Sequence, residues 1–320
     1  MGKYVIKRCI SMIFIIIAAA FVIFTITYLA PGDPASAILG ATASESDLDK
    51  TRHALGVDLP YLQQLWNYMK SVFINFDLGD SWVYGKPVLE ELGLRMPRTL
   101  LIGLTSMVFN VALGVCLGIF AGTHGGKWQD SLTMGIAMIF ISCPDFFVAL
   151  EMIILFAAHL RILPPFGIGT WKHYVMPIVA SALQGIATNA RYGRNSILEV
   201  YRADFVTTAR AKGVPEHDVV YKHMLPNALM PIITNMGMIL SHIITGSVVI
   251  ESVFSIPGVG LYMLDAVTRR DYPVIRGCVL FFAVATSVIM LLTDLAYAMV
   301  DPRIKVQYSA QGARKRRKSA

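Results

Sequence analysis

The chain has 320 residues, of which 55% are hydrophobic and only 15% are charged. That composition is far more apolar than the composition of ordinary soluble domains, so it excludes them as the class of protein. The formal charge of +7 does not indicate nucleic acid binding, because the basic residues flank apolar runs and form no patch with aromatic residues.

The first apolar run covers residues 9–30, contains no charged residue and follows Lys3, Lys7 and Arg8. It is long enough to cross the hydrocarbon core of a bilayer, whereas the apolar region of a signal peptide is shorter. We therefore predict an uncleaved first transmembrane helix with a cytoplasmic N-terminus.

The next segment, residues 31–98, is too polar to lie in a membrane and too long for a simple connection. Ser44 is a suitable N-cap for a helix over residues 44–54, and Gly56 is a suitable end for it. A second, amphipathic helix is predicted over residues 59–76, with Pro60 in its first turn. We expect a small extracytoplasmic subdomain that lies against the membrane surface.

Five further apolar runs have about the length that a membrane-spanning helix needs. They cover residues 99–121, 132–158, 174–198, 231–254 and 277–300. Glycine and proline within them, such as Pro144, do not count against spans, because neighbouring helices can satisfy the freed backbone groups. Gly114, Gly118 and Gly122 share one face of the second run, which predicts close contact with a neighbouring helix.

The expected fold is therefore an all-α integral membrane protein with six transmembrane helices. The predicted division is residues 1–30 as N-terminus and first helix, 31–98 as subdomain, 99–302 as core and 303–320 as a basic tail. Most basic residues fall on the side of the two termini, which favours the cytoplasm for both ends. Arg269, Arg270 and Arg276 fall on the outer side, against this trend, and the tail is expected near anionic headgroups.

A polar stretch interrupts the apolar runs at residues 204–231. We predict a short helix over residues 202–212, a left-handed turn at Gly213 and a second helix over residues 216–224 that begins after Pro215. Pro226 is expected to end the second helix, because proline cannot continue it. The resulting elbow between two spans suits docking onto another protein, and it contains no catalytic constellation.

Ionisable residues inside apolar runs are candidates for function, because each is costly in hydrocarbon. Glu151, His242 and Asp294 are the candidates for a translocation path. Structural pairing with a neighbouring helix is an equal alternative for the two carboxylates, and a hydrogen-bonded core position is the favoured alternative for His242. Arg191 and Arg194 are interpreted as interfacial anchors, and the four scattered cysteines as apolar packing residues without metal spacing.

The elbow resembles the EAA signature of ABC importer permeases. Thr207, Thr208 and Ala209 stand at the positions of Glu-Ala-Ala, and Gly213 and the stretch His223-Met224-Leu225-Pro226 follow at the family's spacing. Thr207 replaces the glutamate and His223 the isoleucine of the general pattern. The form of the motif is similar to the branch that imports dipeptides, oligopeptides and nickel.

Further stretches resemble the same branch in the same order along the chain. They are residues 31–34 (PGDP), 77–80 with 85–88, and 251–260 with 271–273. The long first loop and the PGDP stretch look like the B-type permease subunit. The likeness covers the chain from its first span to about Pro302.

The resemblance implies a multi-pass permease of the bacterial inner membrane that provides half of a translocation path for peptides. A second permease would complete the path, two ATPase subunits would carry ATP and Mg²⁺ on the cytoplasmic side, and an extracytoplasmic binding protein would deliver substrate. The implied coupling residues are Thr207, Thr208, Ala209, Gly213, His223, Leu225 and Pro226. Candidate contacts for the binding protein are Glu251, Pro257, Gly258 and Asp271, with a re-entrant structural role as the alternative.

Hydrolysis of ATP by this chain is not expected. The nearest fragment to a phosphate-binding loop, residues 122–127, lacks the first glycine and is followed by Trp128 where serine or threonine belongs. The main alternative function is a proton-coupled secondary transporter that uses Glu151 and Asp294, although no inverted repeat is visible. A membrane scaffold without transport activity is the third possibility. Peptide is favoured over nickel as substrate by the weight of the branch, and no single residue decides between them.

Overall fold

The computed structural model describes residues 2–40, 42–228 and 248–300, with side chains described for residue 6 and for 8–40, 42–228 and 248–292. Helices and loops account for these residues, apart from an isolated antiparallel bridge between Asp80 and Pro87. The predicted fifth span and the basic tail lie mostly or wholly outside the described residues. The chain divides into two compact units, Met1–Thr99 with Pro257–Val288 and Leu100–Ile256 with Ile289–Ala320.

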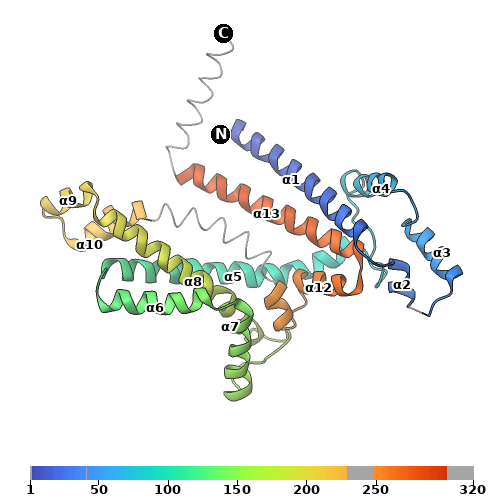
Figure 1. Cartoon of the computed structure of the whole chain (residues 1–320). Coiled ribbons are helices and arrows are strands. Elements are labelled where there is room, and N and C mark those ends of the chain that lie inside the picture. Colours follow the sequence, from blue (N-terminus) through green and yellow to red (C-terminus); the bar gives the residue numbers. More distant parts are fainter. Residues whose placement is uncertain (1, 41, 229–247, 301–320) are drawn as a thin grey trace, which may run out of the picture. The chain divides into compact units, whose positions relative to one another are not determined.

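Unit 1 begins with the long helix α1 (Gly2–Leu29), followed by α2 (Pro34–Leu39), α3 (Glu45–Leu55) and α4 (Tyr61–Phe73). It also contains the start of α5 (Val88–Thr123), α12 (Val259–Arg269) and the first part of α13 (Tyr272–Val300). The helix α1 contacts α4, and α2 contacts α3 (Figure 1). A segment near the C-terminal end of the chain therefore belongs to the same compact unit as the first loop.

The two helices predicted for the first loop are present. Ser44 caps α3 through its side-chain oxygen, which accepts a hydrogen bond from the Asp47 amide at 3.3 Å, and Gly56 ends the helix with φ +65°. Pro60 directly precedes α4, which is shorter than the predicted range. Leu62 and Trp66 are 75% and 68% exposed on α4, so part of its apolar face is left open.

Within the described ranges, three helices are long and apolar enough to cross a membrane: Arg8–Leu29, Val88–Thr123 and Tyr272–Leu292. Only 11% of the apolar stretch in the first of these helices is buried, and large side chains such as Phe14 are exposed. An apolar helix with an open surface is stable where lipid or another apolar helix surrounds it. These helices correspond to the first, second and sixth predicted spans.

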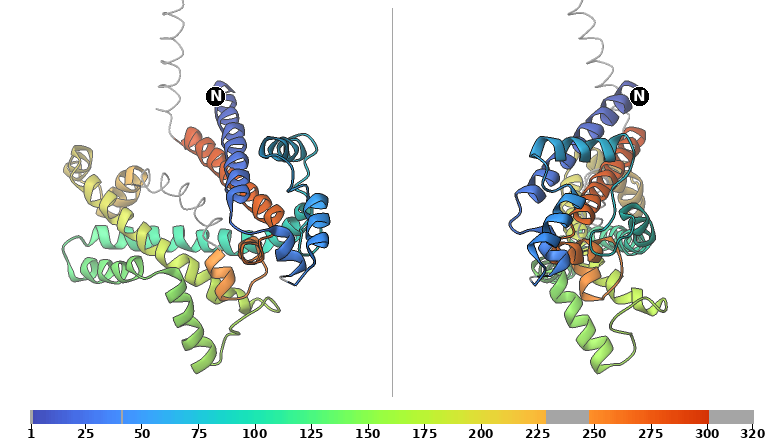
Figure 2. Two further views of the ribbon diagram at one scale, coloured as in Figure 1. Left: turned by 45° about the vertical axis from the view of Figure 1, so that its right-hand side comes forward. Right: turned by 90° about the vertical axis from the view of Figure 1, so that its right-hand side faces the viewer.

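The third predicted span is broken. Residues 132–158 do not form one helix, because α6 (Trp128–Ser142) and the pair α7 (Asp145–Met152) and η1 (Ile153–His159) meet at an angle of 100°. The break falls at Cys143 and Pro144, where both residues have extended backbone. A proline removes a helical hydrogen bond and disfavours helical backbone in the residue before it. Figure 2 shows α7 turned away from the line of α6.

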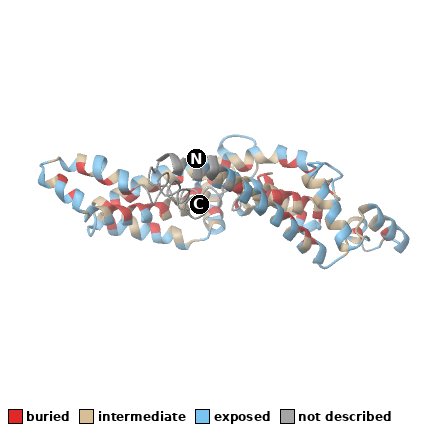
Figure 3. Ribbon diagram, turned by 90° about the horizontal axis from the view of Figure 1, so that it is seen from above, coloured by how far each residue is buried: buried red, intermediate tan, exposed pale blue. Residues whose placement is uncertain are grey.

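The helix α8 (Lys172–Tyr201) belongs to unit 2 and contacts both α6 and α7. It is long enough to span a bilayer but carries more polar residues than the three apolar helices. Its buried residues include Ala180, Ala187, Ala190 and Ile197. Figure 3 colours the buried residues of the chain red, and on the helices they alternate with exposed residues in pale blue.

The predicted close contact of the glycine face is confirmed, and its partner is α8. A Cβ atom added at Gly114 would lie 2.6 Å from Cβ of Asn189, and one at Gly118 would lie 2.9 Å from Cα of Gly193. Contacts advance in the same direction along both helices, so α5 and α8 run parallel. Parallel neighbours require the chain to return between them, which agrees with one intervening crossing by α6 and α7.

A buried hydrogen bond lies in the same seam. The Asn189 side-chain amide donates to the side-chain oxygen Oδ1 of Asn110 at 2.6 Å, and both residues are at most 2% exposed. A Cβ atom at Gly185 would fall on the Asn110 side chain. The glycines therefore make room both for backbone contact and for this polar pair, which joins the helices where water is excluded.

The first prediction concerns Gly118. Replacement by alanine should lower the melting temperature of the purified protein, since the new methyl group meets backbone atoms of α8 and overpacking costs about 1–3 kcal/mol. Gly135→Ala in α6 is the matched control, because nothing lies within 4 Å of its added Cβ atom. Thermal unfolding in mild detergent should show a clear loss for the first variant only; equal melting temperatures would contradict the close contact.

Candidate functional site

The first arm of the elbow is α9 (Asp204–Ala211), which starts two residues after the predicted position. It ends in a Schellman motif: the Gly213 amide donates to the Arg210 carbonyl at 2.9 Å, and the Val214 amide donates to the Ala209 carbonyl at 3.3 Å. Gly213 has φ +76°, the left-handed conformation that the sequence predicted. Glycine thus sets the change of direction between the arms.

The second arm consists of α10 (Glu216–Asp218) and the π-helix η2 (Val219–Met224), and it continues as α-helix over residues 225–228. The prediction that Pro226 ends this arm is wrong. A π-helical turn, which is wider than an α-helical turn, precedes Pro226. It changes the pattern of backbone hydrogen bonds at the point where the proline has no N–H to donate. The Asn227 side-chain amide donates to the His223 carbonyl at 2.9 Å, so a side chain adds a donor in this irregular turn.

A small apolar core holds the two arms together and attaches them to α8 and α5. Val206, Ala209, Val219, Met224 and Ala228 are buried there with Ile197 of α8, and Ile119 of α5 packs at the edge. Ala209 is 6% exposed. Its small side chain therefore permits close packing between the arms, and it does not form part of the outer face of the elbow.

Ion pairs brace the outside of the turn. The Arg210 guanidinium donates two hydrogen bonds to Glu216, at 3.1 and 2.6 Å, and lies 4.2 Å from the centre of the Tyr201 ring. The Arg210 side chain lowers the pKa of Glu216 below its usual value. Lys222 pairs with Asp218 at 2.8 Å one turn apart. These contacts fix the angle between α9 and the second arm.

The remaining coupling candidates lie on the outer face. Thr207, Thr208, Gly213, His223 and Pro226 are exposed, and Leu225 is half-buried. Nothing lies within 4 Å of a Cβ atom placed on Gly213, so the bend is open on its outer side. The elbow thus combines a packed interior with an outer surface that also exposes large side chains such as Phe205 and Tyr221.

The path candidates are not brought together by the described residues. Glu151 is exposed on α7, and no ion pair to it occurs within the described part of the chain. His242 lies outside the described residues, and of Asp294 only the backbone in α13 is described. The path role of these three residues stays a prediction.

Among the candidate binding-protein contacts, Asp271 has a structural position. It is 1% exposed and accepts hydrogen bonds from the Ser81 hydroxyl at 2.5 Å and from the amides of Trp82 and Val83 at 3.1 and 3.3 Å. These contacts hold the loop before α5 against the start of α13. They favour the structural alternative for this carboxylate.

The other three candidates lie around the turn before α12. Glu251 is fully buried, Gly258 is also buried, and Pro257 is half-buried with its carbonyl accepting from Arg98 at 3.2 Å. The Val259 amide donates to the Thr99 hydroxyl at 2.9 Å. The turn is therefore fixed to the start of the long helix α5 within unit 1.

Arg194 forms an ion pair that its predicted role did not include. Arg194 was interpreted as an interfacial anchor, but its guanidinium makes a bidentate pair with Asp130 at 2.6 and 2.7 Å, and the Asp130 side chain is only 4% exposed. Asp130 also accepts from the Gly126 amide at 3.0 Å. The pair joins the start of α6 to α8, near the elbow end of that helix. Sequence spacing gave no signal for a contact across this separation.

The chain matches two family models and several known proteins. The family model described as binding-protein-dependent transport system inner membrane component matches residues 114–306, and the model for the N-terminal part of such components matches residues 1–103. The chain is 38% identical over 305 residues to the glutathione transport system permease protein GsiC of Escherichia coli strain K12. The GsiC protein of Salmonella typhimurium strain LT2 has the same identity, and the alignments cover 95% of this chain and 99% of each relative.

The second prediction concerns pH and the elbow. The lowered pKa of Glu216 means that its pair with Arg210 contributes stability above the unfolded pKa of about 4.5 and loses it as pH falls through the folded pKa. Glu216→Gln should therefore lower the melting temperature slightly at pH 7, and the difference from the unaltered protein should shrink as pH falls below 4.5 through the folded pKa. Melting curves from pH 7 to pH 3 test this; a difference that is as large at pH 3 as at pH 7 would refute the charge-pair explanation.

Proposed function

We propose, from the premise that the chain belongs to the family of binding-protein-dependent transport system inner membrane components, that its elbow couples ATP hydrolysis on partner subunits to transport. Members of this family are membrane permease subunits of ABC-type importers and are not the ATPases. The chain is accordingly an integral inner-membrane permease for peptide-type substrates. The roles of single residues described below are proposals.

The observation that carries the proposal is the construction of the elbow. Its interior is packed on Ile197 and Ile119, which belong to α8 and α5, whereas Thr207, Thr208 and His223 remain outside. A push on the outer face would therefore be passed to two membrane helices as a rigid-body displacement, because close-packed cores transmit strain. Exposed residues and membrane helices are linked here through a few buried apolar contacts.

The parallel course of α5 and α8 supports a cytoplasmic elbow. Two parallel helices end on the same side of the membrane, so the loop around Gly125 and the elbow share one side. Arg202, Arg210, Lys212 and Lys222 follow α8 there, and basic residues are favoured in the cytoplasm. We propose that both termini lie on that side, as the basic N-terminus and C-terminal tail also suggest.

The remaining parts of the machine are proposed from the family. A second permease subunit would complete the path, two ATP-binding subunits would carry ATP and Mg²⁺ against the two elbows, and an extracytoplasmic protein would deliver the solute. The relatives are named for glutathione, which is a tripeptide. We propose short peptides as the transported class, with nickel and other solutes as outcomes that a transport assay distinguishes.

The third prediction tests the docking face. Thr208→Arg places a long charged side chain on the exposed side of α9 and should abolish recovery of ATP-binding subunits with the tagged, solubilised protein. Thr42→Arg makes the same change on an exposed loop residue of unit 1 and serves as the control. Mass spectrometry and ATPase activity of the purified complexes provide the measurement. Equal recovery of ATP-binding subunits with both variants would refute docking on this face.

A further inference from the structure

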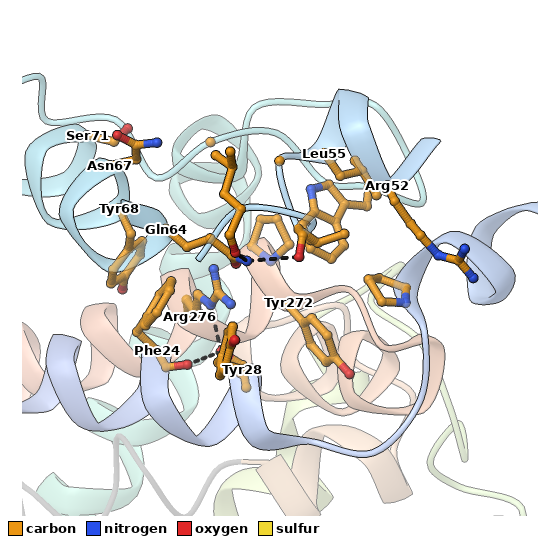
Figure 4. A pocket seen from close by; sticks show the side chains of 18 of the residues that line it. Phe24, Tyr28, Arg52, Leu55, Gln64, Asn67, Tyr68, Ser71, Tyr272 and Arg276 are labelled. Carbon is orange, nitrogen blue, oxygen red and sulfur yellow. Dashed lines mark hydrogen bonds between the residues drawn. The ribbon is translucent and has the colours of Figure 1, made fainter. Parts of the chain in front are cut away.

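A cavity of about 710 Å³ lies within unit 1, bounded by α1, the segment that contains α2 and α3, α4, the loop at residues 77–82 and the start of α13. Figure 4 shows Arg276 in the space between α1, with Phe24 and Tyr28, and α4, with Gln64, Asn67 and Tyr68. Its volume is in the range of small-molecule binding sites. None of the coupling or path candidates described above lines this cavity.

Arg276 is held in an unusual setting for a cation. Its Nε atom donates to the Thr27 hydroxyl at 2.7 Å, and its guanidinium lies 4.5 Å from the centre of the Phe24 ring and 5.4 Å from that of Tyr68. Aromatic faces attract a cation and hold it in place. They do not accept its remaining N–H groups, and no carboxylate pairs with Arg276 among the residues that the structure describes.

Three other arginines of the same unit have acidic partners. Arg52 pairs with Asp33 at 2.7 Å, Arg95 with Glu91 at 2.6 Å and Arg269 with Asp265 at 2.8 Å. Arg276 is half-buried, and its partly desolvated charge has the Thr27 hydroxyl as acceptor but no counter-ion among the described residues, which is costly. The hydroxyl of Tyr68 is buried beside it and has no hydrogen-bond partner among the described residues. The cavity therefore offers donors whose natural complement is a carboxylate.

The opposite charge is also present on the cavity lining. Asp33 and Asp58 are engaged by Arg52 and His53. Asp77 and Asp80, in contrast, form no ion pair within the described residues, and both are exposed on the loop that lines the cavity. One unpaired cation and two unpaired carboxylates favour a ligand with charges of both signs over a multiply charged anion.

We infer that this cavity binds a short zwitterionic peptide, with its terminal carboxylate on the guanidinium of Arg276 and its ammonium group toward Asp77 and Asp80. The inference rests on the proposed function for the class of solute, and it adds a binding site in the extracytoplasmic subdomain of the permease itself. Arg276 then serves as the carboxylate receptor. The Thr27 hydroxyl and the rings of Phe24 and Tyr68 hold its guanidinium for that contact.

The fourth prediction is a direct binding measurement on the full chain. Trp82 lines the cavity, whereas Trp66, Trp128 and Trp171 are 68–72% exposed elsewhere, so replacing these three by phenylalanine leaves Trp82 as a reporter. In phosphatidylcholine nanodiscs, Ala-Ala should change the Trp82 emission saturably. The Ala-Ala amide, which lacks the carboxylate, should bind about 10-fold or more weakly, because it loses charged hydrogen bonds.

Substitutions in the protein test the same contact between Arg276 and the peptide carboxylate. Arg276→Gln should weaken Ala-Ala binding about 10-fold or more, and Arg276→Lys, which keeps the charge, should lose less. Arg269→Gln, outside the cavity lining, should leave binding unchanged. Titration of the amide against unaltered Arg276 keeps the test decisive if a variant fails to fold.

Three outcomes would overturn the inference. They are the absence of a saturable change with Ala-Ala, equal binding of Ala-Ala and its amide, and an emission change that arises only with phosphatidylglycerol in the nanodisc. The last result would assign the cavity to a lipid headgroup. Because the assay needs no ATPase or second permease, its failure leaves the proposed function standing, and failure of ATP-driven transport leaves a positive binding result standing.

Discussion

The close approach of α5 and α8 is the contact on which the rest of unit 2 depends. Gly114, Gly118 and Gly122 place no side chain of α5 in the contact, so the α8 backbone approaches Gly118 and the Ile197 side chain packs on Gly122. Helices in hydrocarbon gain little from burying apolar surface, so van der Waals contact and buried polar pairs must hold them together. The seam supplies both, and it ends at Ile197, the residue on which the elbow core is built.

In the elbow, the buried residues make the structure rigid, and a different set of residues stays accessible on the outside. In the elbow, Ala209 and Met224 face inward, the Arg210–Glu216 pair braces the bend, and the threonines and His223 remain outside. Unit 1 uses the same division: Asp271 is buried and organises the loop before α5, whereas Arg276 has a charge that no carboxylate of the described residues matches. Function is proposed at the exposed outer face of the elbow and at the charge of Arg276, and packed contacts surround both.

Local signals in the sequence predicted local structure well. The Ser44 cap, the left-handed Gly213 and the glycine face of α5 depend on residues a few positions apart, and the structure contains all three. Pro226 and Pro144 were misjudged because a proline's effect depends on its surroundings: a π-turn accommodates the first, and the second breaks the helix. Contacts between distant residues, such as Asp130 with Arg194 or Arg276 with Phe24, leave no periodic pattern. The inward direction of Ala209 likewise depends on the packing of the second arm, which spacing alone does not reveal.

The central claim is that this chain transports as one half of an ATP-driven path. The most direct test is uptake of a labelled short peptide into proteoliposomes that contain this chain, a second permease and the ATP-binding subunits, with the binding protein supplied on the outer side. The account predicts uptake that requires ATP and the binding protein and that a proton gradient alone does not support. Uptake by this chain alone, driven by a proton gradient without ATP, would contradict it and would point to a secondary transporter.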